Sequence, residues 1–131
     1  MTIIITQWAL DSYLSLLHRN VFSATDYWNT IRPDILLLRN YPAAIKFQNG
    51  KFWSPAQGRS GIIANGYKMK WHQIGPGRVQ LRLPIVIIGS DAFLCEAYVK
   101  ANPRTEQRKL ARFQVHRARI QRGQFSIVGT L

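Results

Sequence analysis

The amino-acid sequence predicts an α+β fold in a single domain that spans residues 1–131. Three observations predict it. The first 40 residues combine one β-branched run with two helical patterns, residues 67–100 alternate between apolar and polar side chains, and a strongly basic helical pattern follows. We therefore expect a small antiparallel sheet with two N-terminal helices packed on one face and a basic C-terminal helix.

The N-terminal part of the chain predicts one strand and two helices. Thr2–Thr6 is β-branched throughout, which favours a strand. Apolar residues recur at helical spacing over Trp8–His18. Ser23 or Thr25 can then cap a second helix that runs toward Arg39.

The middle of the chain predicts a long loop and a meander. Residues 41–66 are rich in Pro, Gly and Asn but also contain aromatic residues, which indicates an ordered, packed loop inserted in the domain. Regular alternation then predicts three strands, joined by glycine-containing turns, at residues 67–74, 78–85 and 93–100.

The last part of the chain predicts a helix. Asn102 is a suitable N-cap, Pro103 suits the first helical position, and Gly123 can end the helix after about Gln121. Residues 124–131 form either a short last strand or a tail.

The charge of the chain is one-sided. It has 18 Lys and Arg residues against 6 Asp and Glu, for a formal net charge of +12. Self-repulsion of this kind does not stabilise a fold, so the excess favours a polyanionic partner such as nucleic acid. The carboxylates are scattered singly along the chain, and no glycine-rich phosphate-binding loop is present, so we expect neither a metal centre nor a cofactor.

One face of the predicted meander gathers much of this charge. Residues of like parity on neighbouring antiparallel strands share a face. That face suits a phosphate backbone, and its aromatic rings can stack on bases. The alternative is an ordinary solvated sheet face. The face contains Lys68, Lys70, His72, Arg78, Gln80, Arg82, Glu96, Tyr98 and Lys100.

The predicted last helix adds a basic stripe to this surface. Cations recur there every four residues, and like charges at this spacing repel, so an anionic partner would stabilise them. A solvated helix face is the alternative. The stripe contains Arg104, Arg108, Arg112, His116 and Arg119, and we expect it to bind RNA together with Lys68 and Lys100.

RNA cleavage by attack of the 2′-hydroxyl is the reaction that this surface favours. Such a reaction needs a base, an acid and cations that stabilise the charge developing on phosphorus. The candidate proton-transfer groups are His72, Tyr98 and Glu96, and the candidate stabilising cations are Arg78, Arg82, Lys68 and Lys70. His116 could join them if it points inward.

Two stretches of the sequence resemble the RelE/ParE/HigB superfamily of bacterial toxin–antitoxin toxins. The first, similar to the family's opening strand and helix, is Ile4-Ile5-Thr6-Gln7-Trp8-Ala9-Leu10-Asp11-Ser12-Tyr13-Leu14. The second, similar to a Gly-x-Gly-Arg strand and the strand before a polar helix, comprises Gly75-Pro76-Gly77-Arg78-Val79-Gln80-Leu81-Arg82 and Phe93-Leu94-Cys95-Glu96-Ala97-Tyr98-Val99-Lys100-Ala101-Asn102-Pro103. Residues 41–66 and 124–131 depart from the family pattern.

The resemblance implies a RelE-like fold and a toxin that a cognate antitoxin neutralises. Family members are either ribosome-dependent mRNA endonucleases or, in the ParE branch, gyrase inhibitors. The Gly-x-Gly-Arg match implies Arg78 as the first catalytic candidate, and Arg82 and Lys70 follow from the shared sheet face. A nucleic-acid-binding protein without enzymatic activity is a further alternative.

The sequence also predicts where the protein acts. No apolar run approaches the ~20 residues of a transmembrane helix. The opening residues lack the basic region of a secretory signal. We therefore expect a cytoplasmic protein that does not enter a membrane.

Overall fold

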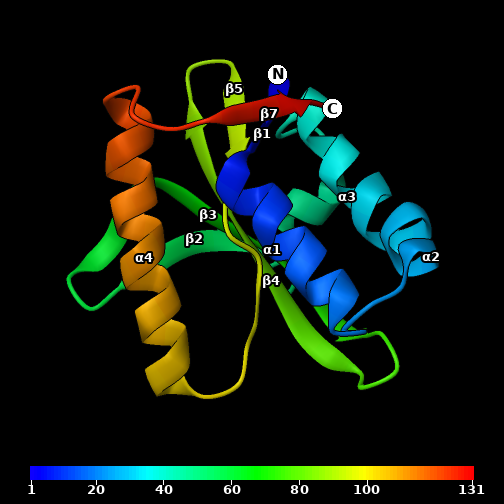
Figure 1. Ribbon diagram of the computed structural model, residues 1–131. Helices are drawn as coiled ribbons and strands as arrows, with labels where there is room; N and C mark the ends of the chain where they lie inside the picture. Colours follow the sequence, from blue (N-terminus) through cyan, green and yellow to red (C-terminus); the bar gives the residue numbers. More distant parts are fainter.

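The computed structural model describes residues 1–131 and contains one seven-stranded sheet flanked by helices (Figure 1). The strands are β1 (Thr2–Thr6), β2 (Trp53–Gly58), β3 (Gly61–Ile74), β4 (Val79–Ile88), β5 (Asp91–Leu94), β6 (Tyr98–Val99) and β7 (Ile127–Thr130). Their order is β2-β3-β4-β5-β1-β7, and β6 pairs with β4. β1 and β5 are parallel, and the other pairings are antiparallel.

Helical segments lie on both sides of the sheet. They are α1 (Gln7–His18), α2 (Ala24–Asp26), a π-helical segment (Tyr27–Ile31), α3 (Arg32–Leu36), 3-10 turns at Leu37–Asn40 and Ile45–Gln48, and α4 (Pro103–Gln121). Figure 1 shows α4 on the left and α1 with α2 and α3 on the right. None of the helices combines the length and the apolar composition that crossing a bilayer requires.

Alternate side chains of the strands enter two separate hydrophobic cores. Ile3 of β1 and Ile85 of β4 belong to the larger core, which the buried side chains of α1 and α3 complete. Ile4 and Val86, each the next residue along its strand, pack in the smaller core under α4. This alternation is the period-two pattern of a sheet that is covered on both faces.

Thr6 places the start of α1 directly against the sheet. Its fully buried hydroxyl donates to the Leu94 carbonyl at 2.6 Å and accepts from the Ala9 amide at 3.3 Å. The same side chain therefore caps α1 and joins it to β5. Farther along α1, the Ser12 hydroxyl accepts from the Ala97 amide at 2.9 Å, which holds the segment before β6 beside this helix.

The second predicted helix is an irregular helical run. Ser23 and Asp26 form a capping box at its start, as the sequence predicted for Ser23. The run then widens into a π-helical turn ahead of Pro33. Because proline has no N–H and its ring crowds the carbonyl four residues earlier, a regular α-helix cannot continue through this position.

Part of the predicted 41–66 loop is strand. Residues 53–66 form the β2–β3 hairpin, although they include Pro55 and several glycines that are depleted in strands. Pro55 is tolerated because β2 lies at the edge of the sheet. Trp53 stacks on Tyr67 at 5.0 Å, so the aromatic residues of this segment are packed, as expected.

Gly66 allows α4 to approach the sheet closely. A Cβ atom at this position would lie 2.8 Å from a ring carbon of Phe113 and 3.1 Å from the Ile63 carbonyl oxygen. A larger residue would therefore push α4 away from β3. Phe113 is among the largest fully buried side chains of the protein.

The predicted architecture is wrong, although the class α+β is right. A small antiparallel sheet with two N-terminal helices on one face was expected, whereas the sheet has seven strands, one parallel pairing and an irregular helical run in place of the second helix. The expected strand at residues 93–100 is also two strands, β5 and β6, that pair with different parts of β4. The pairing of β1 with β5 and β7 joins distant segments, so no local pattern could reveal it.

Candidate nucleic-acid interface

One end of the sheet face that packs on α4 carries charged side chains. The register aligns Lys70 of β3 with Arg82 of β4, and Arg82 with Tyr98 of β6. Parity places Lys68 on the same face as Lys70. Glu106 of α4 bonds to Tyr98 at this end. We call the following residues the cationic cluster: Lys68, Lys70, Arg82, Tyr98, Lys100 and Glu106.

Arg82 is the most buried cation of the cluster. Only 4% of the residue is exposed. Its guanidinium donates to the Gln80 side-chain oxygen at 2.8 Å and to the carbonyls of Leu81 and Trp71 at 3.2 and 3.4 Å. Burial lowers the pKa of Arg82, while Glu106 and Tyr98 oppose that change. Because arginine stays protonated even when buried, the cluster holds a permanent positive charge in a fixed orientation.

A hydrogen bond between Tyr98 of β6 and Glu106 of α4 links the sheet residues of the cluster to the helix. The buried Tyr98 hydroxyl, in a residue 3% exposed, donates to Oε2 of Glu106 at 2.8 Å. Burial raises the pKa of Tyr98, and the hydrogen bond to Glu106 raises it further. The phenol is therefore a hydrogen-bond donor and not a base at neutral pH.

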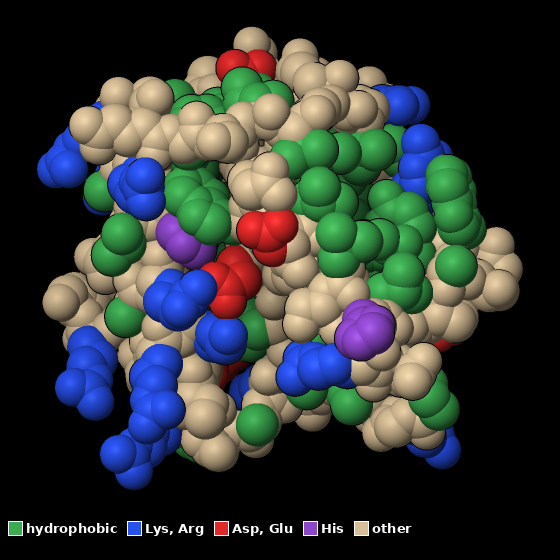
Figure 2. Space-filling model, in the orientation of Figure 1, with side chains coloured by type: hydrophobic (Ala, Val, Ile, Leu, Met, Phe, Trp, Pro, Cys, Tyr) green, Lys and Arg blue, Asp and Glu red, His purple; other side chains and the backbone are tan.

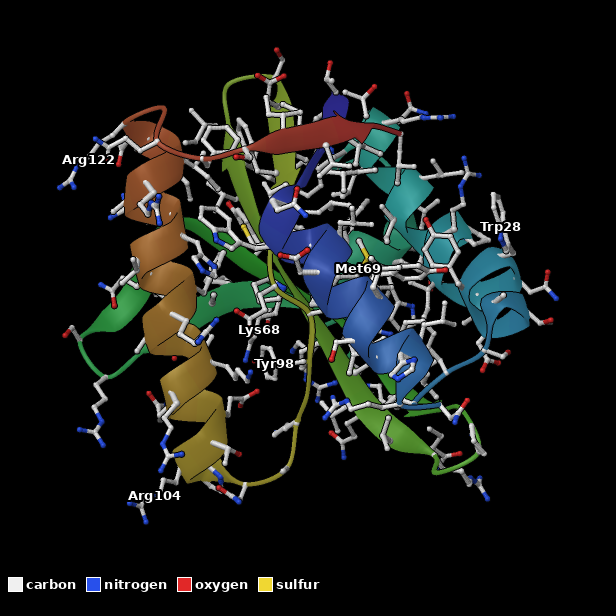
Figure 3. The ribbon with its side chains drawn as sticks, in the orientation of Figure 1. Trp28, Lys68, Met69, Tyr98, Arg104 and Arg122 are labelled. Atoms are coloured by element: carbon white, nitrogen blue, oxygen red, sulfur yellow. The ribbon has the colours of Figure 1, made fainter.

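Lys68 and Lys70 are partly buried and differ in their contacts. Lys70 Nζ donates to the Gly50 carbonyl at 2.7 Å, whereas Lys68 forms neither a hydrogen bond nor an ion pair within the chain. Burial lowers the pKa of both lysines, and the charges of Arg82 and Lys100 lower it further. The Lys68 ammonium is therefore free to bind an anion, whereas that of Lys70 is already held by a backbone carbonyl. Figure 3 shows Lys68 and Tyr98 in the space between α4 and the segment that leads into it.

The cluster lacks balancing negative charge. Four cations surround a single carboxylate, and none of the four forms an ion pair. The three ion pairs of the structure lie elsewhere: Lys46–Asp34, Lys109–Glu96 and Arg112–Glu96. Cations held close together without counter-charges favour the binding of an anion.

Two predicted site residues lie at the margin of this cluster. The exposed His72 has Nε2 2.8 Å from the Lys51 carbonyl oxygen, in the same turn that receives Lys70. Arg78 lies in the turn before β4 with a φ of 50° and donates to Gln73 at 2.7 Å. The register of β3 and β4 shifts between Trp71 and Ile74, so the strict alternation assumed for Arg78 ends before this turn.

Glu96 does not join the cationic cluster. Its carboxylate pairs with Lys109 at 3.0 Å and with Arg112 at 2.8 Å on the flank of α4 that faces α1. The sheet pairing is interrupted between β5 and β6, which turns Glu96 away from the face that parity predicted. These contacts lower the pKa of Glu96 despite its burial.

The residues of the predicted basic stripe on α4 have different surroundings, and three of them are buried or bonded within the chain. His116 is only 7% exposed and stacks on Trp8 at 4.0 Å, so it is a core residue. Burial lowers its pKa. Arg112 pairs with Glu96, and Arg119 donates to the Gln124 carbonyl at 3.0 Å.

Arg104 and Arg108 remain exposed, without a partner in the chain. Figure 3 shows Arg104 pointing outward from the first turn of α4. In the view of Figure 2, Lys and Arg side chains gather over α4 and along the lower edge, whereas hydrophobic side chains gather over α1 and its neighbouring helices.

Glu106 is the residue of the site that the sequence did not assign. Glu106 lies one helical turn before the buried Leu110 and interrupts the apolar stripe of α4. A carboxylate at such a position was the one sign in the sequence that this residue has a polar partner. Its partner Tyr98 lies on a separate strand, so only the docking of α4 brings the two together.

The cations and hydrogen-bonding groups of the cationic cluster are suited to anion binding and proton transfer. No group of three or more His, Cys, Asp or Glu side chains is placed to hold a metal ion. Comparison with protein-family models, with curated proteins and with solved structures finds no match to this chain.

Proposed function

We propose that this protein binds single-stranded RNA at the cationic cluster and cleaves its backbone. The observation that carries the proposal is the set of four unpaired cations around one buried tyrosine and one carboxylate. Lys and Arg at a nucleic-acid site neutralise phosphates and release counterions, which supplies most of the sequence-independent affinity. Cations held by a rigid sheet also suit the charge that develops on phosphorus during cleavage.

The cluster contains a group for each step of an attack by the 2′-hydroxyl. The 2′-oxygen bonds to phosphorus and the bond to the 5′-oxygen breaks, which yields a 2′,3′-cyclic phosphate and a 5′-hydroxyl. Glu106, the only carboxylate of the cluster, accepts the proton of the 2′-hydroxyl. Lys68, whose pKa is lowered, gives a proton to the departing 5′-oxygen. Arg82 and Lys70 stabilise the additional negative charge.

The test compares Lys68→Gln with Arg39→Gln on a labelled RNA. Arg39 is exposed in the helical run that packs on the opposite face of the sheet. We expect Lys68→Gln to slow cleavage by about 100-fold or more, the size typical of losing a general acid, and Arg39→Gln to cleave like the unmodified protein. Undiminished cleavage by Lys68→Gln would rule out the assigned site.

A second candidate function is binding of nucleic acid without cleavage. The contacts favour it in one respect, because Arg82, Tyr98 and Lys70 already use polar groups within the protein. This function predicts RNA binding with a steep dependence on salt and no cleavage products. Intact RNA in the presence of bound protein would select it over the nuclease.

The toxin hypothesis is also a proposal and rests on the sequence resemblance. It implies a cytoplasmic protein that meets mRNA on the ribosome and has a cognate antitoxin. Induced expression should then arrest growth, and Lys68→Gln should relieve the arrest. Loss of DNA supercoiling with intact RNA would instead favour a gyrase inhibitor.

A further inference from the structure

A second basic recess lies beside α4, away from the cationic cluster. It is a groove of about 430 Å³ between the tip of the β2–β3 hairpin and the outer side of α4. Ala111 is the one hydrophobic residue among the eight that line it. The residues that matter here are Arg59 and Ser60 of the hairpin and Arg104, Gln107 and Arg108 of α4.

The groove has the chemistry of a phosphate-binding surface. Three arginines from two separate elements face it, and no carboxylate lines it. None of the three forms an ion pair within the chain. Guanidinium groups bind phosphate oxygens in a bidentate manner, and the Ser60 hydroxyl and Gln107 amide add neutral hydrogen-bonding groups suited to ribose.

Strand β2 connects the groove to the cationic cluster. Ser54 at the start of β2 pairs with Lys68, and Gly58 at its end lines the groove. Four residues of strand span about 13 Å at ~3.3 Å per residue. That span corresponds to at most about four nucleotides, because ~3.4 Å per nucleotide is the rise of a stacked strand in a duplex and an unstacked strand is more extended.

We propose that the groove binds the phosphate backbone of the same RNA strand, within about four nucleotides of the cluster. The inference rests on the proposed function, because it takes the cluster as the place where the strand is cleaved. The groove extends the binding site for long RNA and does not contact the scissile phosphate. Its contribution must therefore depend on the length of the RNA.

The test measures binding by fluorescence anisotropy, with a labelled dinucleotide, which is too short to reach both sites, and a labelled RNA of about 12 nucleotides. The groove variant is Arg59→Gln/Arg108→Gln. A charge-matched control, Arg19→Gln/Arg39→Gln, removes two exposed arginines outside α4 and the hairpin. All four side chains are exposed, so both variants should keep the thermal stability of the unmodified protein.

For the longer RNA, we expect the groove variant to lose roughly tenfold or more in affinity and about 1.4 in the slope of log K against log salt, for two phosphate contacts. The control should lose much less affinity for the longer RNA, and the dinucleotide should bind the unmodified protein and both variants alike. Equal losses for both RNA lengths, or equal losses for groove and control variants, would overturn the proposal.

Lys68→Gln separates this proposal from the proposed function. If Lys68→Gln weakens binding of both RNAs and the groove variant has no effect on the longer one, the groove proposal fails alone. If the groove variant weakens binding while Lys68→Gln affects neither binding nor cleavage, the cluster is not the RNA site and the proposed function fails.

Discussion

Replacing Glu106 with glutamine removes the only negative charge of the cationic cluster and keeps the size of the side chain. The Tyr98 hydroxyl can still donate to the amide oxygen, so the link between α4 and β6 persists. Glu106 raises the pKa of both Lys68 and Tyr98, and the substitution should therefore lower the pKa of both groups. Binding and cleavage of RNA should then change in opposite directions.

Three magnitudes follow from the geometry. A hydrogen bond to a charged group contributes about 1.5–3 kcal/mol and a neutral one about 0.5–1.5, so Glu106→Gln should lower the free energy of unfolding by about 1 kcal/mol. A base within hydrogen-bond reach of the 2′-oxygen lies about 5 Å from the scissile phosphate, where the repulsion is about 3 kcal/mol at an effective dielectric constant of ~20, so RNA should bind roughly 100-fold more tightly. Loss of the general base should slow cleavage by about 100-fold or more.

Urea unfolding, anisotropy and a gel assay of labelled RNA measure these three quantities. Glu96→Gln is the matched control, because it removes a carboxylate that pairs with Lys109 and Arg112 outside the cluster. The control should leave cleavage unchanged. If the Glu106→Gln protein cleaves RNA at the normal rate, Glu106 is not the base. If that protein binds RNA more weakly than the unmodified protein, the carboxylate does not lie near the bound phosphates.

Three further substitutions, one of them a control, test the packing of α4. Gly66→Ala should destabilise the protein by about 1–3 kcal/mol in urea unfolding, because the new Cβ meets Phe113 at 2.8 Å. Gly50→Ala, with no atom within 4 Å of the new Cβ, should change stability by less than about 0.5 kcal/mol. His116 has a lowered pKa, so below a pH of about 6.5 the unfolded state takes up the proton first and stability falls as the pH decreases. His116→Phe, which keeps the stack on Trp8, should reduce this pH dependence, and an unchanged pH profile would show that His116 is not its source.

Part of the cluster could be read from alternation alone. Lys68, Lys70 and Arg82 occupy strands with strict alternation, and their observed register agrees with the face that parity assigned to them. The same reasoning did not hold for Arg78 or Glu96. Both lie where the strand pairing is interrupted, and parity has no meaning outside a continuous strand.

For helix α4, too, the sequence predicted the local features but not the contacts with other elements. Its caps and bounds follow from local residues, because Asn102 accepts from the Thr105 amide at 3.0 Å and Gly123 ends the helix with a positive φ. The residues of the helix alone did not predict which side of it faces the sheet. His116, expected on a basic stripe that binds RNA, stacks on Trp8 because α1 and α4 approach each other there.

The α+β class, the excess of positive charge and the alternation that places cations together on β3 and β4 could be predicted from the residues alone, since these features depend on composition and on neighbours within a few residues. The contact of Glu106 with Tyr98, the burial of His116 and the pairing of β1 with β5 and β7 are visible only in the folded protein. Each of those contacts depends on how separate elements dock, and docking is set by the shapes of the two cores as a whole rather than by any single segment.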